Sequence, residues 1–232
     1  MRKHLSVGIL LAGSTIVPVI GLLMATAAVE AALFFTTAAE ERYLFLTEGK
    51  MPLVCGIGFV GLCAVLTLTG SLGSKTRYTL ERLSVTERTV TLWQGIYNAV
   101  CLLIAWGAQL GLLLLFWHLT RQTEGTGLFE QEAFTYFYKN GFAHSLLPLS
   151  EPVRLLRNAV LLLSLGMTGA CFSRRLRQGK WSAAFLVLAV AAVLLFPMPA
   201  GNMTMDILMM IGAAVLTAAA VYRLWEVSAN EI

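Results

Sequence analysis

The chain has 232 residues, of which 57% are hydrophobic and only 13% are charged. Soluble domains carry roughly 25% charged residues, so this composition and a mean hydropathy of +0.74 indicate a protein whose solvent is lipid. The net charge of +4 does not favour nucleic acid as a partner, because the basic residues lie in short segments between apolar runs.

Six apolar stretches are long enough to predict helices that cross a hydrocarbon core of roughly 30 Å. They are 5–29, 52–72, 95–118, 153–172, 181–197 and 205–224. Together they predict an all-α fold, a single transmembrane domain over 1–232 built as a polytopic bundle of six helices. The first stretch also has the basic start of a cleaved signal peptide. Its apolar run exceeds the roughly 7–15 residues of such a signal, which favours a retained span.

Lys and Arg residues indicate the orientation, because the cytoplasmic loops of membrane proteins are enriched in them. With the N-terminus inside, eleven of the 17 Lys and Arg residues fall on the cytoplasmic side, including the tight turn RRLRQGK at 174–180. Glu30 is assigned to the outer side, and Asp206 to a cap at the outer start of the sixth span. Arg154 and Arg157 are expected to extend to the membrane interface. Both termini are therefore predicted inside, in a multi-pass protein of a bacterial plasma membrane.

Residues 73–94 form the predicted cytoplasmic loop between the second and third spans, GSKTRYTLERLSVTERTVTLWQ. Within it, Ser84 and Glu87 form a capping box: the Ser84 side chain binds the amide of Glu87, whose carboxylate reaches back to the amide of Ser84. A helix is therefore predicted to begin near Val85 and to continue into the third span. The preceding short helix mixes apolar and charged residues, which indicates contact with the lipid surface or with another protein.

The run TRYTLERLSVTERTVTLWQGIYNAV resembles the second-to-third span connection of permease subunits of type-2 ATP-binding-cassette (ABC) exporters. In that family a T-L-E-x-L run, a short break and a polar helix start precede the third span. The resemblance implies a coupling helix that docks on a separate ATPase subunit, and that ATP and Mg are bound by this partner and not by the chain itself. The implied docking residues are Tyr78, Leu80, Glu81, Arg82 and Leu83. It also implies six spans with both termini inside.

No motif in the chain predicts catalysis. The stretch GSLGSKT at 70–76 is not a phosphate-binding loop, because Ser74 separates the glycine from the lysine. The three His residues, His4, His118 and His144, lie near span ends or in loops. The four cysteines lack the spacing of metal ligands: Cys55, Cys63, Cys101 and Cys171. The chain is therefore predicted to have no enzymatic activity, no metal and no cofactor of its own.

Within the predicted spans, polar groups are few and no acid or base is predicted deep in the bundle, which argues against a carrier of ions or protons. Gln109 lies mid-span between Gly107 and Gly111. Two roles stay open for these residues: close helix packing through a G-x-x-x-G pair, and the lining of a substrate path. The absence of deep charge favours an amphipathic, peptide or lipid-like cargo.

The outer segment 119–152 is rich in aromatic residues, which predicts an amphipathic helix lying in the outer interface. These residues are Phe129, Phe134, Tyr136, Phe137, Tyr138 and Phe142. Such a helix serves either as a gate for cargo or as a plain anchor.

The function predicted from the sequence is a small, divergent permease subunit of an ABC exporter. It lies in membrane lipid, and works as a homodimer or with a similar permease and an ATP-binding subunit. Two alternatives remain open: a carrier that uses no ATPase, and a scaffold or sensor that transports nothing.

Overall fold

A computed structural model describes residues 2–38, 41–47, 49–72, 86–124, 140–148, 151–180, 182–195 and 203–229. These residues are almost entirely helical and contain no strand, which confirms the predicted all-α class. The helices are α1 (Arg2–Thr36), α2 (Arg42–Thr47), α3 (Lys50–Leu72), α5 (Glu87–Glu124), α7 (Gly141–Leu146), α8 (Pro152–Arg177), α9 (Ala183–Leu195) and α10 (Met203–Ala229).

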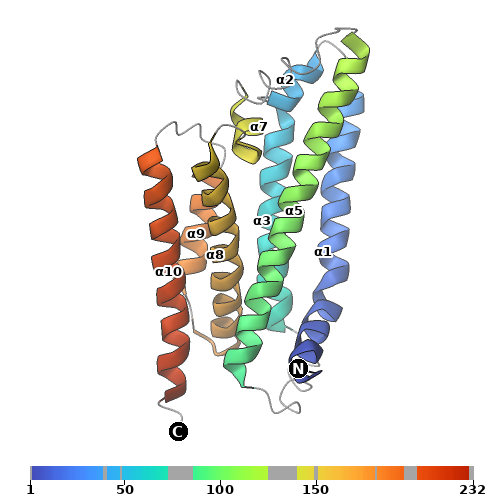
Figure 1. Cartoon of the computed structure of the whole chain (residues 1–232). Helices are drawn as coiled ribbons and strands as arrows, with labels where there is room; N and C mark the ends of the chain where they lie inside the picture. The colour runs from blue at the N-terminus through green and yellow to red at the C-terminus, as the bar shows by residue number, and fades with distance from the viewer. Residues whose placement is uncertain are drawn as a thin grey trace.

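The longer helices run side by side, up and down the length of a bundle (Figure 1). Helix α1 begins and helix α10 ends at the same end of this bundle, while the short helices α2 and α7 lie toward the other end. A topology with both termini on the same side of the membrane requires that α1 begin and α10 end at the same end of the bundle. Which membrane face that end meets stays a prediction.

Five of the described helices are long and apolar enough to cross a membrane: α1, α3, α5, α8 and α10. Helix α9 has only 13 residues, a length of roughly 20 Å at 1.5 Å per residue, which is less than the roughly 30 Å of a hydrocarbon core. It is the counterpart of the predicted span 181–197, of which 181, 196 and 197 lie outside the described residues. The chain is therefore a multi-pass membrane protein with five long spans, and a sixth crossing stays a prediction.

The surface of the bundle is apolar, as lipid requires. Large hydrophobic side chains point outward on several helices, and Val17 of α1, Ile57 of α3 and Val215 of α10 are each at least 60% exposed. Polar and charged side chains such as Glu30 and Asn158 are instead wholly buried. Lipid cannot satisfy a polar group, so these groups must find their partners inside the protein.

Helix α8 packs against α3, α5, α9 and α10 and is the most buried of the long spans. Its closest approach is to α5, where a Cβ on Gly166 would lie 2.5 Å from the backbone nitrogen of Ala99. On α5, a Cβ on Gly95 would meet the side chain of Met167 of α8. Glycine at both positions lets the two backbones approach, so α5 and α8 form one tightly packed pair.

The predicted turn at 174–180 is present. Helix α8 ends at Arg177, and Gly179 takes a φ of +69°, a conformation that glycine adopts without strain. The Lys180 amide donates to the carbonyl of Arg175, five residues earlier, at 2.9 Å. This hydrogen bond is characteristic of a Schellman motif at a helix C-terminus.

The same end of α8 is fastened to two neighbouring helices. Arg174 Nε donates to the Glu87 carboxylate at the start of α5, at 2.9 Å. The Ser173 hydroxyl donates to the carbonyl of Thr67 on α3, at 2.7 Å. These bonds join α3, α5 and α8 near the end of α3 and the start of α5.

Candidate functional site

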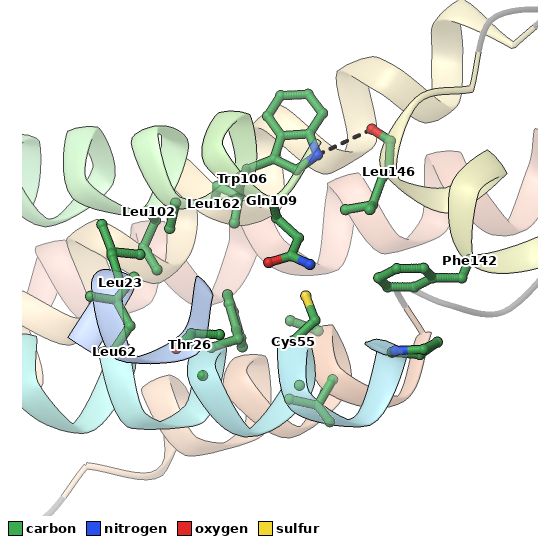
Figure 2. A pocket seen from close by; sticks show the side chains of 17 residues that line it. Leu23, Thr26, Cys55, Leu62, Leu102, Trp106, Gln109, Phe142, Leu146 and Leu162 are labelled. Carbon is green, nitrogen blue, oxygen red and sulfur yellow. Dashed lines mark hydrogen bonds between the residues drawn. The ribbon is translucent and has the colours of Figure 1, made fainter. Parts of the chain in front are cut away.

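An apolar pocket of about 160 Å³ lies among helices α1, α3, α5, α7, α8 and α9 (Figure 2). The lining side chains with strong hydrogen-bond donors are Thr26, Trp106 and Gln109. The Thr26 hydroxyl donates to the carbonyl of Leu22 at 2.9 Å, and the Trp106 ring N–H donates to the carbonyl of Leu146 at 3.1 Å. Gln109 is therefore the side chain that gives the pocket its polarity.

Gln109 is held by a carboxylate on the neighbouring helix α1. Its Nε2 donates to Glu30 Oε1 at 2.8 Å, and Glu30 is 0% exposed. The second carboxylate oxygen of Glu30, Oε2, is buried and has no hydrogen-bond partner among the described residues. Figure 2 shows the Gln109 amide on the pocket side of α5, with Cys55 of α3 facing it.

The sequence-based placement of Glu30 outside the membrane is wrong. Helix α1 continues seven residues past the predicted end of the first span, to Thr36, and carries Glu30 inside the bundle. A signal for this was present, because Glu30 is followed by the apolar run Ala31–Phe35 before any polar residue. One charge within an apolar run predicts a buried functional group more often than a loop.

The short helix α7 lies toward the end of the bundle opposite to the chain termini (Figure 1) and contributes to the lining of the pocket. Asn140 caps this helix, and its Oδ1 accepts from the amides of Phe142 and Ala143 at 3.0 and 3.2 Å. All residues from Phe142 to Leu146 are buried, and both Phe142 and Leu146 line the pocket. The helix is thus an inserted plug rather than a surface element.

This placement corrects two predictions for the outer segment. Phe142 was assigned to a helix lying in the interface, and His144 to an interfacial position, yet each is only 8% exposed. His144 Nε2 lies 3.7 Å from the Glu151 carboxylate. The remaining aromatic residues of the segment, within 125–139, lie outside the described residues. Hydropathy alone does not distinguish an aromatic helix in the interface from one buried under the rest of the protein.

A buried polar network joins α7, α8 and α10 beside the pocket. Arg157 Nη1 binds Asp206 Oδ1 at 2.7 Å, and Arg157 Nε and Nη2 both donate to Asn158 Oδ1, at 3.2 and 2.9 Å. The Asn158 amide nitrogen in turn donates to the carbonyl of Ser145 at 2.7 Å. One arginine therefore connects the start of α10 to the plug.

This network overturns the predicted environments of its charged residues. Arg154 and Arg157 do not extend to an interface, since they are 2% and 0% exposed. Arg154 lies 3.5 Å from Glu151. Asp206 does lie in the first turn of the last long helix, as predicted, but its carboxylate binds Arg157 rather than only capping that helix.

The sequence-predicted coupling residues Tyr78, Leu80, Glu81, Arg82 and Leu83 lie outside the described residues, and so does the cap Ser84. Glu87 is described: it is the first residue of α5, close to the predicted start near Val85. Its carboxylate binds Arg174, a partner that the capping-box prediction did not contain.

The structure separates the three residues that were grouped on the third span. Gln109 is buried and lines the pocket, whereas Gly107 and Gly111 are exposed. No atom of another described residue lies within 4 Å of where a Cβ on either glycine would stand. Among the described glycines, Gly58, Gly95 and Gly166 are instead the ones packed closely against another helix.

Fold and site together define an all-helical, multi-pass membrane protein with a small pocket backed by a buried carboxylate–amide pair. Among the described residues no group of three His, Cys, Asp or Glu side chains is placed to hold a metal ion. Comparison with models of protein families, with characterised proteins and with solved structures finds no match.

Proposed function

We propose that this protein is the permease subunit of an ABC exporter and moves an amphipathic, peptide or lipid-like cargo with energy from a separate ATPase. The proposal rests on the resemblance of the segment 76–88 to a coupling helix and helix start. One observation supports it above the others: helix α5 begins at Glu87, at the end of this segment, and runs unbroken for 38 residues. Gln109 and Trp106, which line the pocket, lie on the same helix.

A continuous helix transmits displacement along its axis, because every backbone hydrogen bond lies within it. Helix α5 is also fastened to α8 by the Glu87–Arg174 ion pair and by the close contact at Gly166. A push on the coupling segment would therefore move α5 and α8 together relative to α1. Residues of all three helices line the pocket, so its opening would change with that movement.

The partners follow from this proposal. ATP and Mg belong to the ATPase subunit, which docks on Tyr78, Leu80, Glu81, Arg82 and Leu83. The transport path is completed by a second copy of the chain or by a similar permease. The cytoplasmic face is then the end of the bundle that carries the chain termini and the turn at 174–180.

Co-purification tests the docking residues. Tagged full-length protein is isolated from its native membrane in mild detergent, and the co-purifying ATPase is identified by mass spectrometry and by ATP hydrolysis. The double substitution Leu80→Asp with Leu83→Asp is expected to remove the ATPase, since charge would replace the apolar contact. Gln178→Asp, an exposed position at the same end of the bundle, is the matched control and should retain it. Intact association of the double variant would refute the docking assignment.

A carrier that uses no ATPase is the second candidate, and Glu30 is the observation that favours it. The sequence argued against such a carrier because no deep acid was predicted, whereas Glu30 is a wholly buried carboxyl in α1. The two functions are distinguished by measuring proton flux in proteoliposomes under a pH gradient and without nucleotide. A carrier shows this flux, whereas a permease that needs an ATPase does not. Loss of that flux in Glu30→Gln would favour the carrier.

A further inference from the structure

The pocket is suited to a small occupant. Its volume of about 160 Å³ is close to that of an apolar cavity of about 150 Å³ that takes up benzene, and well below the roughly 300–1,000 Å³ of drug-sized sites. Leu62, Leu102 and Phe142 are among the side chains that line it. The part of an occupant that lies inside is therefore about the size of one aromatic ring or a short alkyl chain with a single polar group.

The hydrogen bonds around the pocket determine what that polar group must do. The donors of Thr26 and Trp106 are used on backbone carbonyls, and the Gln109 amide nitrogen is used on Glu30. An ionised carboxylate only accepts hydrogen bonds, so the amide nitrogen faces Glu30 and the amide oxygen is left for the pocket. An occupant that donates a hydrogen bond satisfies this oxygen, and one that only accepts does not.

The buried carboxylate adds a preference for positive charge. Glu30 has no salt-bridge partner among the described residues, and its Oε2 is buried without a hydrogen bond. When Glu30 is ionised, its negative charge polarises the Gln109 amide through their hydrogen bond and strengthens the amide oxygen as an acceptor. A cation in the pocket would also offset the cost of a buried, unpaired carboxylate, because Coulomb attraction is strong where water is excluded.

From the shape, the hydrogen bonds and the buried charge, we propose that this pocket binds a small hydrophobic amine in its protonated form. The ammonium group donates to Gln109 Oε1, with the Glu30 carboxylate behind it, and the apolar part fills the space between α3 and α5. This site does not depend on an ATPase partner, so failure of the docking test above leaves it standing, and the reverse also holds.

Protection of Cys55 from alkylation measures occupancy, because Cys55 lines the pocket. The full chain carries alanine in place of Cys63, Cys101 and Cys171 and is placed in nanodiscs of phosphatidylglycerol. The rate at which N-ethylmaleimide modifies Cys55 is followed by mass spectrometry with benzylamine, benzyl alcohol, toluene or benzoate present. Benzylamine is expected to protect at concentrations at least about tenfold lower than the neutral and anionic probes, the equivalent of about 1.4 kcal/mol.

Two substitutions separate the roles of the polar pair. Glu30→Gln should bring benzylamine and benzyl alcohol to equal protection, since the charge is lost and the shape is kept. Gln109→Leu should abolish protection by the amine. Glu41→Gln and Gln122→Leu, both at exposed positions, are the matched controls and should behave as the parent chain.

The thermal stability of the unsubstituted protein provides a measurement that needs no variant. Ligands that bind only the folded state raise the melting temperature, so benzylamine should raise it and benzoate should not. Slower alkylation in nanodiscs of phosphatidylethanolamine, without added amine, would identify a lipid headgroup as the source of the ammonium. Equal effects of toluene and benzylamine, or no effect of any probe, would overturn the proposal.

Discussion

Arg157 connects three elements through one guanidinium group, with one partner far along the chain and one that directly follows it. Asp206 lies at the start of α10, 49 residues away. Asn158 also donates a hydrogen bond to the carbonyl of Ser145 in α7. Both charged side chains are almost completely buried. A charge left alone in such a place is much less stable than a pair, so each residue depends on the other.

Arg157→Met is expected to destabilise the protein by about 3–5 kcal/mol, because it leaves the Asp206 carboxylate buried without a cation. The double variant Arg157→Met with Asp206→Leu should recover most of that loss, since no unpaired charge remains. Thermal unfolding in detergent measures both variants. Arg223→Met, at an exposed position on α10, is the control. The single variant Asp206→Leu is measured as well. If the double variant loses as much stability as Arg157→Met and Asp206→Leu lose in sum, the two residues do not interact energetically.

At the scale of elements, α5 and α8 form the most extensive helix–helix contact in the described bundle. They meet where Gly166 faces the backbone of Ala99. A backbone atom cannot move aside as the end of a flexible side chain can, so an added methyl group forces the helices apart. Gly107 and Gly111, the predicted G-x-x-x-G pair, have open space around them instead. A larger side chain is therefore expected to be tolerated there but not at Gly166.

Gly166→Ala should lower the stability of the folded protein by about 1–3 kcal/mol, the usual range for overpacking a tight interface. Gly107→Ala should be neutral or slightly stabilising, because it adds a methyl group in open space and improves helix propensity. Unfolding of both variants by added denaturing detergent compares them directly. Equal stability of the two would show that the close approach at Gly166 is relaxed in the membrane.

At the scale of the whole molecule, the basic turn after α8 and the two chain termini share one end of the bundle, while α2 and α7 lie toward the other (Figure 1). The charge bias along the sequence predicts that the basic end is cytoplasmic. The plug and the Arg157 network then lie toward the outer leaflet.

Cysteine labelling in intact cells tests this orientation. In a chain with the four native cysteines replaced by alanine, Lys180→Cys should react with a membrane-impermeant maleimide only after the cells are opened. Gln122→Cys, near the end of α5, should react in intact cells. Both positions are exposed, so access depends on the side of the membrane alone. The reverse pattern would place the coupling segment outside, and the ATPase proposal would fail with it.

Properties that depend on neighbouring residues in the chain were predictable. Apolar run length and charge bias gave the membrane class and the positions of the long helices, and the short basic run between two apolar stretches gave the turn at 174–180. The described part of α9 is short, and 181–197 was already the shortest predicted span.

The pairing of buried polar groups was decided by tertiary structure alone. Glu30 meets Gln109 across 79 residues and Arg157 meets Asp206 across 49, distances at which no local pattern reports contact. From the sequence Glu30, Arg157 and Asp206 were each assigned to the nearest water, because a lone charge in lipid is unstable. Once the helices pack, a partner on another helix serves in place of water, and the charge can stay inside.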